Sequence, residues 1–531
     1  MRKTAPLVAL LGATALALTA CGGPASGGTS TPGQGVLADG KTFTTVIATD
    51  PGTLNPLTTV ISVARSIDRF LYGRLIEVQD DGSVVAGLAE KWESTTTEAT
   101  FTIRAGITCE DGTPLTATDV AANISYVGDP ANGSPLMGLQ VLPGTKAVGD
   151  DAARTVTVTS GAPDAFLLDN VGSIAIVCGN VLKDPDALAK GKGATGMFTM
   201  TEIAPNSQYT LTRRKEFTWG PGDWDPTQKG LPDKVVFRVV PNETTATNLL
   251  LSGEVNAALI VGADKKRLQT PDFFTSKLPV PAGQFVFNQN EGRTTADQKV
   301  REALVQSLDL AQLRQVLTGG EGSEPTGLVT IAPNPCRADV VKGHVLGFDE
   351  KAAAKALDDA GWKAGSDGMR AKDGKPLSLS LIYSTQLGDP GNAMAELVQS
   401  SWKKLGVNLA VRAVDGPGVS ETLFSSGDWD VSAVSLTVAL PSMLVPFYAG
   451  PKPPNGTNFA GVDNKAYTAA VTTAASKPGT EGCADWGTAE QALFDSTTVV
   501  PYANDNRTTF VRKATFVESD GIDPTSIRMY E

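Results

Sequence analysis

The acidic pair Glu110 and Asp111 stands beside Cys109 in the stretch FTIRAGITCEDGTPLTATDV, residues 101–120. Two carboxylates can act as general acid and general base, but only when a gap of substrate size separates them. Glu110 and Asp111 are adjacent, and Asp111 with Gly112 predicts a turn in which neighbouring side chains diverge. The spacing therefore argues against catalysis and favours a structural role for this pair.

A helix is expected directly after this turn. Thr116 and Asp119 match the T-x-x-D form of a capping box, which marks the first turn of a helix. Val120 and Ile124 would then face a core. Residues 101–120 are therefore predicted to form a strand, a turn and the start of a helix, and their role is structural.

Two other candidate sites fail on their context. His344 is the only histidine, so a histidine-rich nickel or zinc site is excluded and a serine triad has no recognisable partners. A metal carried inside a small organic chelator would leave no such signature. Residues 191–196, GKGATG, match G-x-G-x-x-G, but a helix-like segment precedes them and a strand-like one follows, the reverse of the dinucleotide fingerprint. We expect no cofactor, no metal site and no enzymatic activity, with a secreted hydrolase as the enzyme alternative.

The N-terminus has the features of an export signal. Arg2 and Lys3 precede a short apolar run without charge, and residues 18–21 read Leu-Thr-Ala-Cys. This pattern looks like a bacterial lipobox, which implies a signal peptide over residues 1–20 and lipid attachment at Cys21. Residues 21–35, rich in Gly, Ser, Thr and Pro, would be a flexible tether to the outer face of the membrane. An ordinary signal peptide with a chance cysteine is the alternative.

Length and charge limit the function classes. About 510 residues follow residue 20, too many for a single core, which predicts two or three subdomains. The formal net charge of −12 disfavours nucleic acid and suits a soluble extracytoplasmic domain. Residues 431–451 carry no charge and could span a membrane by length, but their three prolines favour a buried strand and loop.

Four cysteines remain after Cys21, and an even number in an exported chain predicts two disulfides. Three pairings are open. We favour Cys109–Cys178 and Cys336–Cys483, because each pair then stays within one half of the chain. Free buried thiols are the alternative.

The remaining pattern alternates strands and helices. Asp349 predicts a helix N-cap and Gly361 the end of that helix, and Gly406 ends a further amphipathic helix. Such alternation argues for α/β lobes. The segments richest in β-forming residues are 155–159, 235–240, 377–383 and 407–414.

The ordered motifs resemble those of family 5 extracellular solute-binding proteins, the oligopeptide, dipeptide and nickel-type receptors of ABC importers. Single motifs are degenerate, but their co-occurrence in order over nearly the whole mature chain is specific. The matching segments are TLNPL (53–57), LAEKWE (88–93), residues 101–120, TGMFTMTEIAPN (195–206), FVFNQN (285–290), KVREALVQSLDLAQL (299–313), FDEKAAAKALDDAGW (348–362), WKKLGVNL (402–409) and GDWDV (427–431).

This resemblance implies an α/β, two-lobe fold like that of the periplasmic binding proteins (type II, cluster C), a flytrap with an extra subdomain. Lobe I would comprise residues 36–284 and 499–531, with the extra subdomain at 61–190, and lobe II residues 285–498. Hinges would lie near 285–288 and 499–502. The protein would act as a monomer that closes on its ligand and delivers it to the permease subunits of an ABC transporter.

The resemblance is least informative about the ligand. Peptide receptors of the family commonly hold the peptide's amino terminus with an aspartate shortly after a tryptophan, and the run after GDWD here, VSAVSLTVALPSM, has neither. A buried ammonium without a carboxylate is costly. Oligopeptides remain the default ligand, with a non-peptide small molecule, a metal chelate or a protein partner as alternatives, and a shift of the alignment by several residues would change this assignment. The expected cleft residues are Thr53, Asn288, Gln289, Ser435, Leu436 and Thr437, followed by Asn458 and Phe459.

Overall fold

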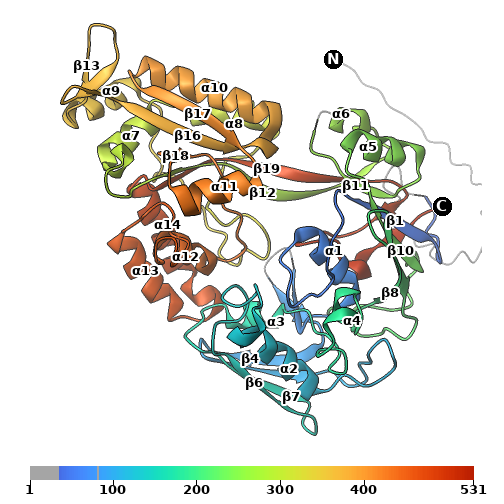
Figure 1. The fold of residues 1–531 in the computed structure, drawn as a ribbon. Coiled ribbons are helices and arrows are strands. Elements are labelled where there is room, and N and C mark those ends of the chain that lie inside the picture. The colour runs from blue at the N-terminus through green and yellow to red at the C-terminus, as the bar shows by residue number, and fades with distance from the viewer. Residues whose placement is uncertain (1–34, 80–82, 263) are drawn as a thin grey trace, which may run out of the picture.

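The computed structural model describes residues 35–79, 83–262 and 264–531, so the predicted signal peptide, Cys21 and nearly all of the tether lie outside the described residues. Two α/β lobes are joined by a pair of long strands that run from one lobe to the other (Figure 1). These strands are β12 (Phe274–Phe287) and β19 (Val499–Val511), which pair antiparallel over most of their length. The predicted two-lobe α/β fold is confirmed.

One sheet of ten strands runs through both lobes. Its order is β17-β16-β18-β12-β19-β11-β1-β10-β9-β8, so the lobe II strands end at β18 and the lobe I strands begin at β11. The lobe I strands are β11 (Ala257–Leu259), β1 (Thr42–Ile47), β10 (Lys234–Val239), β9 (Gln208–Arg213) and β8 (Phe198–Ala204). The lobe II strands are β16 (Ser378–Ser384), β17 (Asn408–Val414) and β18 (Val431–Ser432).

A four-stranded antiparallel sheet extends lobe I within the predicted extra subdomain. Its order is β4-β5-β7-β6. The capping box predicted at Thr116 and Asp119 is confirmed, since each side chain accepts the other residue's backbone N–H. The strands are β4 (Ala89–Ser94), β5 (Glu98–Ile103), β6 (Lys146–Asp150) and β7 (Thr155–Thr159), with α2 (Ala117–Gly128) packed on them.

Helices cover both lobes. Asp349 caps α9 through bonds from two backbone N–H groups, as its sequence context predicts. Lobe I carries α1 (Ser62–Leu71), α3 (Leu167–Gly172), α4 (Pro185–Ala189), α5 (Glu243–Ser252) and α6 (Lys265–Leu268). Lobe II carries α7 (Gln298–Gln306), α8 (Leu310–Thr318), α9 (Glu350–Asp359), α10 (Gly388–Lys404), α11 (Gly416–Ser420), α12 (Val445–Tyr448), α13 (Lys465–Ala475) and α14 (Cys483–Asp495).

Short strand pairs complete the fold. They are β2 (Ile76–Val78) with β3 (Val84–Ala86), β13 (Lys363–Ala364) with β14 (Arg370–Lys372) and β15 (Lys375–Pro376), and β20 (Ala514–Thr515) with β21 (Arg528–Met529). Within the described ranges, no helix has the length and apolar character that crossing a membrane requires.

The acidic pair of the opening stretch is part of the scaffold. Glu110 accepts the N–H of Gly193 at 2.7 Å, and Asp111 accepts the side-chain amide of Asn180, also at 2.7 Å. The two carboxylates are therefore committed to different loops. The loop that contains Gly193 lies between α4 and β8, the helix-then-strand order that disfavoured a nucleotide site.

Two disulfides join the four cysteines in the favoured pairing, Cys109–Cys178 and Cys336–Cys483. The first ties the turn after β5 to the segment after α3, within lobe I. The second ties a long loop of lobe II to the first residue of α14. Each bond stays within one lobe, so neither restricts movement between the lobes.

Each lobe has its own apolar core, and the lobes also meet on the side away from the long strands. Lobe I is centred on residues such as Phe43 and Phe70, and lobe II on residues such as Trp402. Between them, Phe166 packs on Trp486 with ring centroids 5.9 Å apart, and the Gly479 N–H donates to the Ala165 carbonyl at 2.6 Å. The space between the lobes is thus bounded by β12 and β19 on one side and by this contact on another.

The predicted hinges, residues 285–288 and 499–502, fall at the end of β12 and the beginning of β19. The pairing of the two strands ends here, at Val286 with Val499, and β12 also pairs with β18. The placement is suitable for a hinge, and the residue boundaries of the two lobes stay predictions.

Candidate functional site

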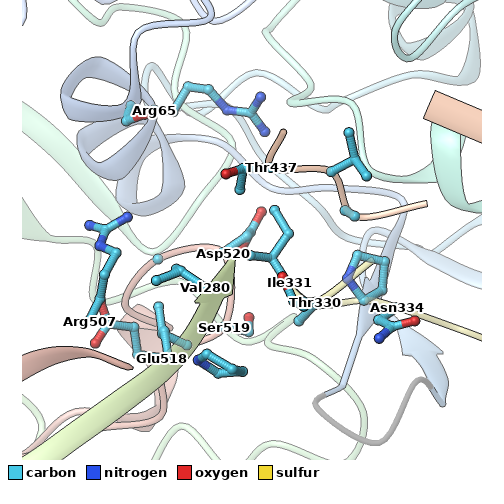
Figure 2. Close-up of a pocket in the computed structure, with 18 of the residues that line it drawn as sticks. Arg65, Val280, Thr330, Ile331, Asn334, Thr437, Arg507, Glu518, Ser519 and Asp520 are labelled. Atoms are coloured by element: carbon cyan, nitrogen blue, oxygen red, sulfur yellow. The ribbon is translucent and has the colours of Figure 1, made fainter. Parts of the chain in front are cut away.

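A cavity of about 1250 Å³ lies between the lobes (Figure 2). Sites for drug-sized ligands are typically about 300–1,000 Å³, so this one is large enough for a short peptide or a compact complex. Lobe I contributes one face of α1 and the segment 518–522, and lobe II contributes the loop 326–340, residues 437–440 and one face of α14. Residues 277–280 of β12 form part of the wall near the hinge.

Most of the wall is apolar. Such walls favour the transfer of apolar ligand surface out of water, while the few polar groups fix orientation. Lobe I supplies Val63, Phe70, Leu136 and Phe237, and lobe II supplies Val329, Ile331, Leu440, Met443, Phe447 and Trp486.

The charged groups of lobe I are mostly paired with each other. Arg74 bonds Asp520 at 2.8 Å, and Arg69 bonds Glu77 at 2.7 Å and lies 3.7 Å from Asp520. Burial opposes ionisation of Asp520, but Arg74 and Arg69 outweigh it and hold its pKa below the ordinary value. Arg69, Arg74, Glu77 and Asp520 therefore form an ionic network, and Arg65 also helps to lower the pKa of Asp520.

Arg65 is different from these neighbours. Its guanidinium forms no hydrogen bond or ion pair with any residue in the described ranges, and Figure 2 shows its side chain extending from α1 into the cavity. Burial, together with repulsion from Arg74, lowers its pKa. An arginine guanidinium is not deprotonated in proteins, so Arg65 presents a positive charge to the cavity.

Lobe II places a carboxylate in the same cavity. Glu490 is 6 % exposed, and its Oε2 accepts the Leu328 N–H at 2.7 Å. Oε1 accepts no hydrogen bond from the described residues, and none of their cations forms an ion pair with Glu490. Burial raises its pKa to about 7.

Three polar atoms near this carboxylate are also unpartnered among the described residues. They are the hydroxyls of Tyr448 and Tyr467 and the indole N–H of Trp486, all in the same core of lobe II. Glu490 adds to the raised pKa of both tyrosines, whose main cause is burial. Glu490 therefore sits in a polar pocket within an otherwise apolar core.

Asp169 of α3 also lines the cavity, on the lobe I side. Burial raises its pKa to about 6, with a smaller contribution from Asp164. Asp169 is less buried than Glu490 and lies in the same lobe as Arg65.

Of the predicted cleft residues, Thr437 lines the cavity and is labelled in Figure 2. Ser435 and Leu436 precede it but lie outside the lining. Leu436 packs on the lobe II core, and its backbone N–H donates to the Gln284 side chain at 3.1 Å. Part of the uncharged stretch 431–451 therefore lines the cavity, but the lining begins at Thr437, two residues after the predicted Ser435.

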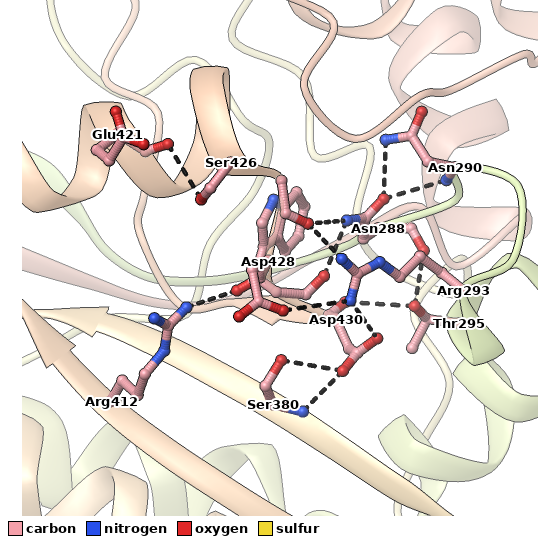
Figure 3. Close-up of polar contacts among 12 residues, drawn as sticks. Asn288, Asn290, Arg293, Thr295, Ser380, Arg412, Glu421, Ser426, Asp428 and Asp430 are labelled. Atoms are coloured by element: carbon pink, nitrogen blue, oxygen red, sulfur yellow. Dashed lines mark hydrogen bonds and ion pairs between the residues drawn. The ribbon is translucent and has the colours of Figure 1, made fainter.

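Asn288 and Gln289 lie outside the lining and hold the hinge end of β12 in place. Asn288 is buried, and its amide donates to the Trp429 carbonyl at 2.8 Å (Figure 3). The Gln289 amide donates to the Thr498 hydroxyl at 3.1 Å, which joins the two strands that link the lobes. Both amides therefore bond groups of the protein itself, a backbone carbonyl for Asn288 and a hydroxyl for Gln289.

The GDWDV motif belongs to the same network. Asp430 accepts from the backbone and hydroxyl of Ser380 and lies 3.5 Å from Arg293, which also lies 3.8 Å from Asp428 (Figure 3). This motif connects β16 and β18 with the segment after β12. Its charges stabilise lobe II rather than face the cavity.

The last three predicted residues also lie outside the lining. Asn458 is buried and exchanges hydrogen bonds with Val462, and Phe459 packs between Trp429 and Phe447 in the lobe II core. Thr53 accepts the Asn55 N–H at 3.2 Å in the opening loop. Asn458 and Phe459 are buried in lobe II, and Thr53 is half-buried in its own loop.

Arg65 and Glu490 were not anticipated from the sequence. Each lies on a helix, where an isolated charged residue usually marks a solvated face. Four α14 residues that line the cavity follow i, i+3, i+4 and i+7 spacing, which places them on one face of the helix. These residues are Cys483, Trp486, Gly487 and Glu490. A glutamate at this spacing from Trp486 was the feature of the sequence that could have indicated a charged residue facing the cavity.

Two lobes linked by two strands, with a large cavity between them, define a solute-binding protein of the two-lobe periplasmic type. A family model described as bacterial extracellular solute-binding proteins, family 5, middle, matches residues 83–457. The chain therefore belongs to family 5 of these proteins. Members of this family bind peptides, nickel or chelates for ABC import, and the relatives matched here are binding proteins rather than enzymes.

Individual relatives differ in their ligands. The periplasmic murein peptide-binding protein MppA of Escherichia coli K12 is 24% identical over 503 residues, covering 88% of this chain and 89% of that protein. The nickel-binding periplasmic protein of the same strain is 25% identical, covering 64% and 65%. A substrate-binding protein from Microbacterium hydrocarbonoxydans, solved with 4-hydroxybenzoate hydrazide, is 25% identical with a TM-score of 0.71, covering 92% of this chain and 100% of that one.

Proposed function

We propose that the protein is a monomeric, lipid-anchored, extracytoplasmic receptor that captures a solute between its lobes and delivers it to the permease of an ABC importer. The observation that carries this proposal is the cavity lined from both lobes beside a two-strand hinge. A solute that contacts both lobes binds the closed form better than the open form, so it shifts the population toward closure.

Oligopeptides are the default ligand in this proposal. The match to a murein peptide-binding protein over most of both chains supports it, and so does the size of the cavity. The sequence objection, a missing carboxylate in the stretch 431–451, loses force because Glu490 supplies a carboxylate from another helix.

A non-peptide small molecule is the second candidate. The part of the uncharged stretch that lines the cavity, residues 437–440, is mainly apolar, and a structure 25% identical to this chain holds an aromatic hydrazide. A metal chelate is also a candidate ligand, because one relative is a nickel-binding protein.

Native mass spectrometry of the chain from residue 22 onward, gently purified and then denatured, tests this assignment. We expect released passengers that are a heterogeneous set of short peptides. A single non-peptide mass would replace the default ligand by the second candidate.

Thr437→Trp, which fills part of the cavity, should lower the amount of passenger, whereas Thr468→Trp on the exposed face of α13 should not. Equal passenger in both variants would contradict binding in this cavity.

The lipid anchor rests on sequence alone, since Cys21 lies outside the described residues. Cys21→Ala should remove lipid labelling and move the protein from the membrane fraction to the soluble fraction. Metabolic labelling with a fatty acid, followed by fractionation, measures both effects. Continued labelling of the alanine variant would refute lipidation at this residue.

A further inference from the structure

Among the charged side chains that line the cavity and form no ion pair with the described residues, Arg65 and Glu490 carry opposite signs and lie on opposite lobes. Arg65 projects from α1 of lobe I, and Glu490 from α14 of lobe II. Within the described ranges, neither side chain forms an ion pair. Arg69 of the same helix and Arg74, which follows the helix, are both paired. This difference is not a matter of residue type, because all three are arginines in one segment.

Burial makes these unpaired charges costly for the folded protein. Removing a charge from water without a partner is unfavourable, and the cost falls when an opposite charge arrives. Glu490 is almost fully buried, with one oxygen bonded to the Leu328 N–H and the other without a donor. A group placed against that second oxygen should be a donor, and a cation would be favoured most.

The surroundings of Glu490 agree with an ammonium group. Trp486 lies one helical turn before it on the same cavity-lining face of α14, and its ring packs against Phe166 of lobe I. Aromatic faces attract cations, and tryptophan does so most strongly.

The surroundings of Arg65 favour an acidic group. Asp520 attracts Arg65, but it is already bonded by Arg74 and lies 3.7 Å from Arg69, and it forms no ion pair with Arg65. Helix α1 itself has one carboxylate, Asp68, which is buried and has both oxygens without a hydrogen bond among the described residues. Asp68 attracts Arg65 but forms no ion pair with it. A planar guanidinium is the best side chain for binding a carboxylate in two-point fashion.

We propose that Glu490 and Arg65 are the residues that select the solute by charge, Glu490 taking an ammonium group and Arg65 an acidic group. The solute is then a zwitterion, such as a short peptide with free termini, and it links the two lobes through its two ends. This inference rests on the proposed receptor function and makes it more specific.

Three peptide libraries test the proposal by native mass spectrometry. They are tri- to hexapeptides of mixed sequence with free termini, the same library N-acetylated, and the same library C-amidated. The wild-type protein should bind the free library, and either modification should weaken binding at least about 10-fold, the scale expected when one partner of a buried charge pair is lost. Equal binding of the modified libraries would overturn the proposal, and so would a failure of the free library to bind.

The variants Glu490→Gln and Arg65→Gln assign each charge to a residue. Glu490→Gln should weaken binding of the free library and leave the N-acetylated library as it was. Arg65→Gln should weaken binding of the free library and leave the C-amidated library as it was. Glutamine keeps the size of the glutamate side chain and an acceptor for the Leu328 N–H, and thermal unfolding verifies that both variants fold.

Other charged side chains in the cavity provide the competing assignment. Asp169→Asn or Arg507→Gln would lose the discrimination between free and modified peptides if those residues read the charges instead, and this result would overturn the proposal. Glu481→Gln, on the exposed surface just before α14, is the matched control. A passenger without both charged groups would contradict the zwitterion while leaving the receptor function intact, whereas a protein that binds no solute of any kind would contradict the receptor itself.

Discussion

Glu490 is held inside lobe II, 6 % exposed, where burial raises its pKa to about 7. In the unfolded chain the same carboxyl titrates near its ordinary value of 4.5. Between these two values the unfolded chain releases a proton that the folded protein keeps, so folding loses stability as the pH rises. The loss is complete above about pH 7 and amounts to about 3 kcal/mol.

Glu490→Gln should remove this dependence. The variant's thermal midpoint should be close to the wild-type value near pH 4.5 and higher than it at pH 8. Differential scanning calorimetry across this range measures the difference, and comparison of two proteins cancels the contribution of other groups such as Asp169. Glu481→Gln, at an exposed position, should follow the wild-type curve. An identical pH dependence in wild type and Glu490→Gln would contradict a buried Glu490 whose pKa is raised by folding.

At the scale of residues, the sequence identified local roles better than ligand contacts. Asp349, Thr116 and Asp119 were assigned correctly, because a cap depends on neighbours within three residues. Asn288 and Asn458 were expected in the cleft and instead bond the backbone. Whether an amide faces a cavity or its own backbone depends on the packing of distant segments, which a single sequence does not specify.

At the scale of elements, α2 depends on its capping box. Thr116 accepts the Asp119 N–H at 3.0 Å, and Asp119 accepts the Thr116 N–H at 3.0 Å. Loss of an N-cap side chain costs about 1 kcal/mol. Thr116→Ala should therefore speed hydrogen exchange of the first amides of α2 about 5-fold, if they exchange by local opening.

Mass spectrometry of peptides covering α2 measures this exchange. Thr118→Ala lies in the same turn and leaves the box intact, so it should change exchange there much less. If Thr116→Ala exchanges like the wild type, the capping box does not stabilise this helix.

Elements were predictable where a pattern is local and strong. The segment 155–159 coincides with β7, and 407–414 with β17 to within one residue. Helix α1, which carries Arg65, was not predicted, because it begins without a side-chain cap and charged residues interrupt the apolar residues of its sequence SVARSIDRFL. Its assignment depends on the burial of one face against lobe I, a tertiary effect.

At the scale of the whole molecule, the described residues include two contacts that join the lobes, and the cavity lies between the lobes. The long strands β12 and β19 form one contact, and the packing of Phe166 on Trp486 forms the other. The second contact can separate without breaking either disulfide, since each disulfide lies within one lobe. Lobe opening about the strands is therefore the expected motion, and the solute favours the closed form.

The most direct measurement of this account is small-angle X-ray scattering of the same protein in two states. One sample is stripped of passenger by unfolding in guanidinium with its disulfides oxidised, followed by refolding, and the other is saturated again with the released passenger, as verified by native mass spectrometry. We predict a smaller radius of gyration for the loaded protein, because the solute joins the lobes. Superimposable scattering profiles at verified saturation would contradict a receptor that closes on its ligand.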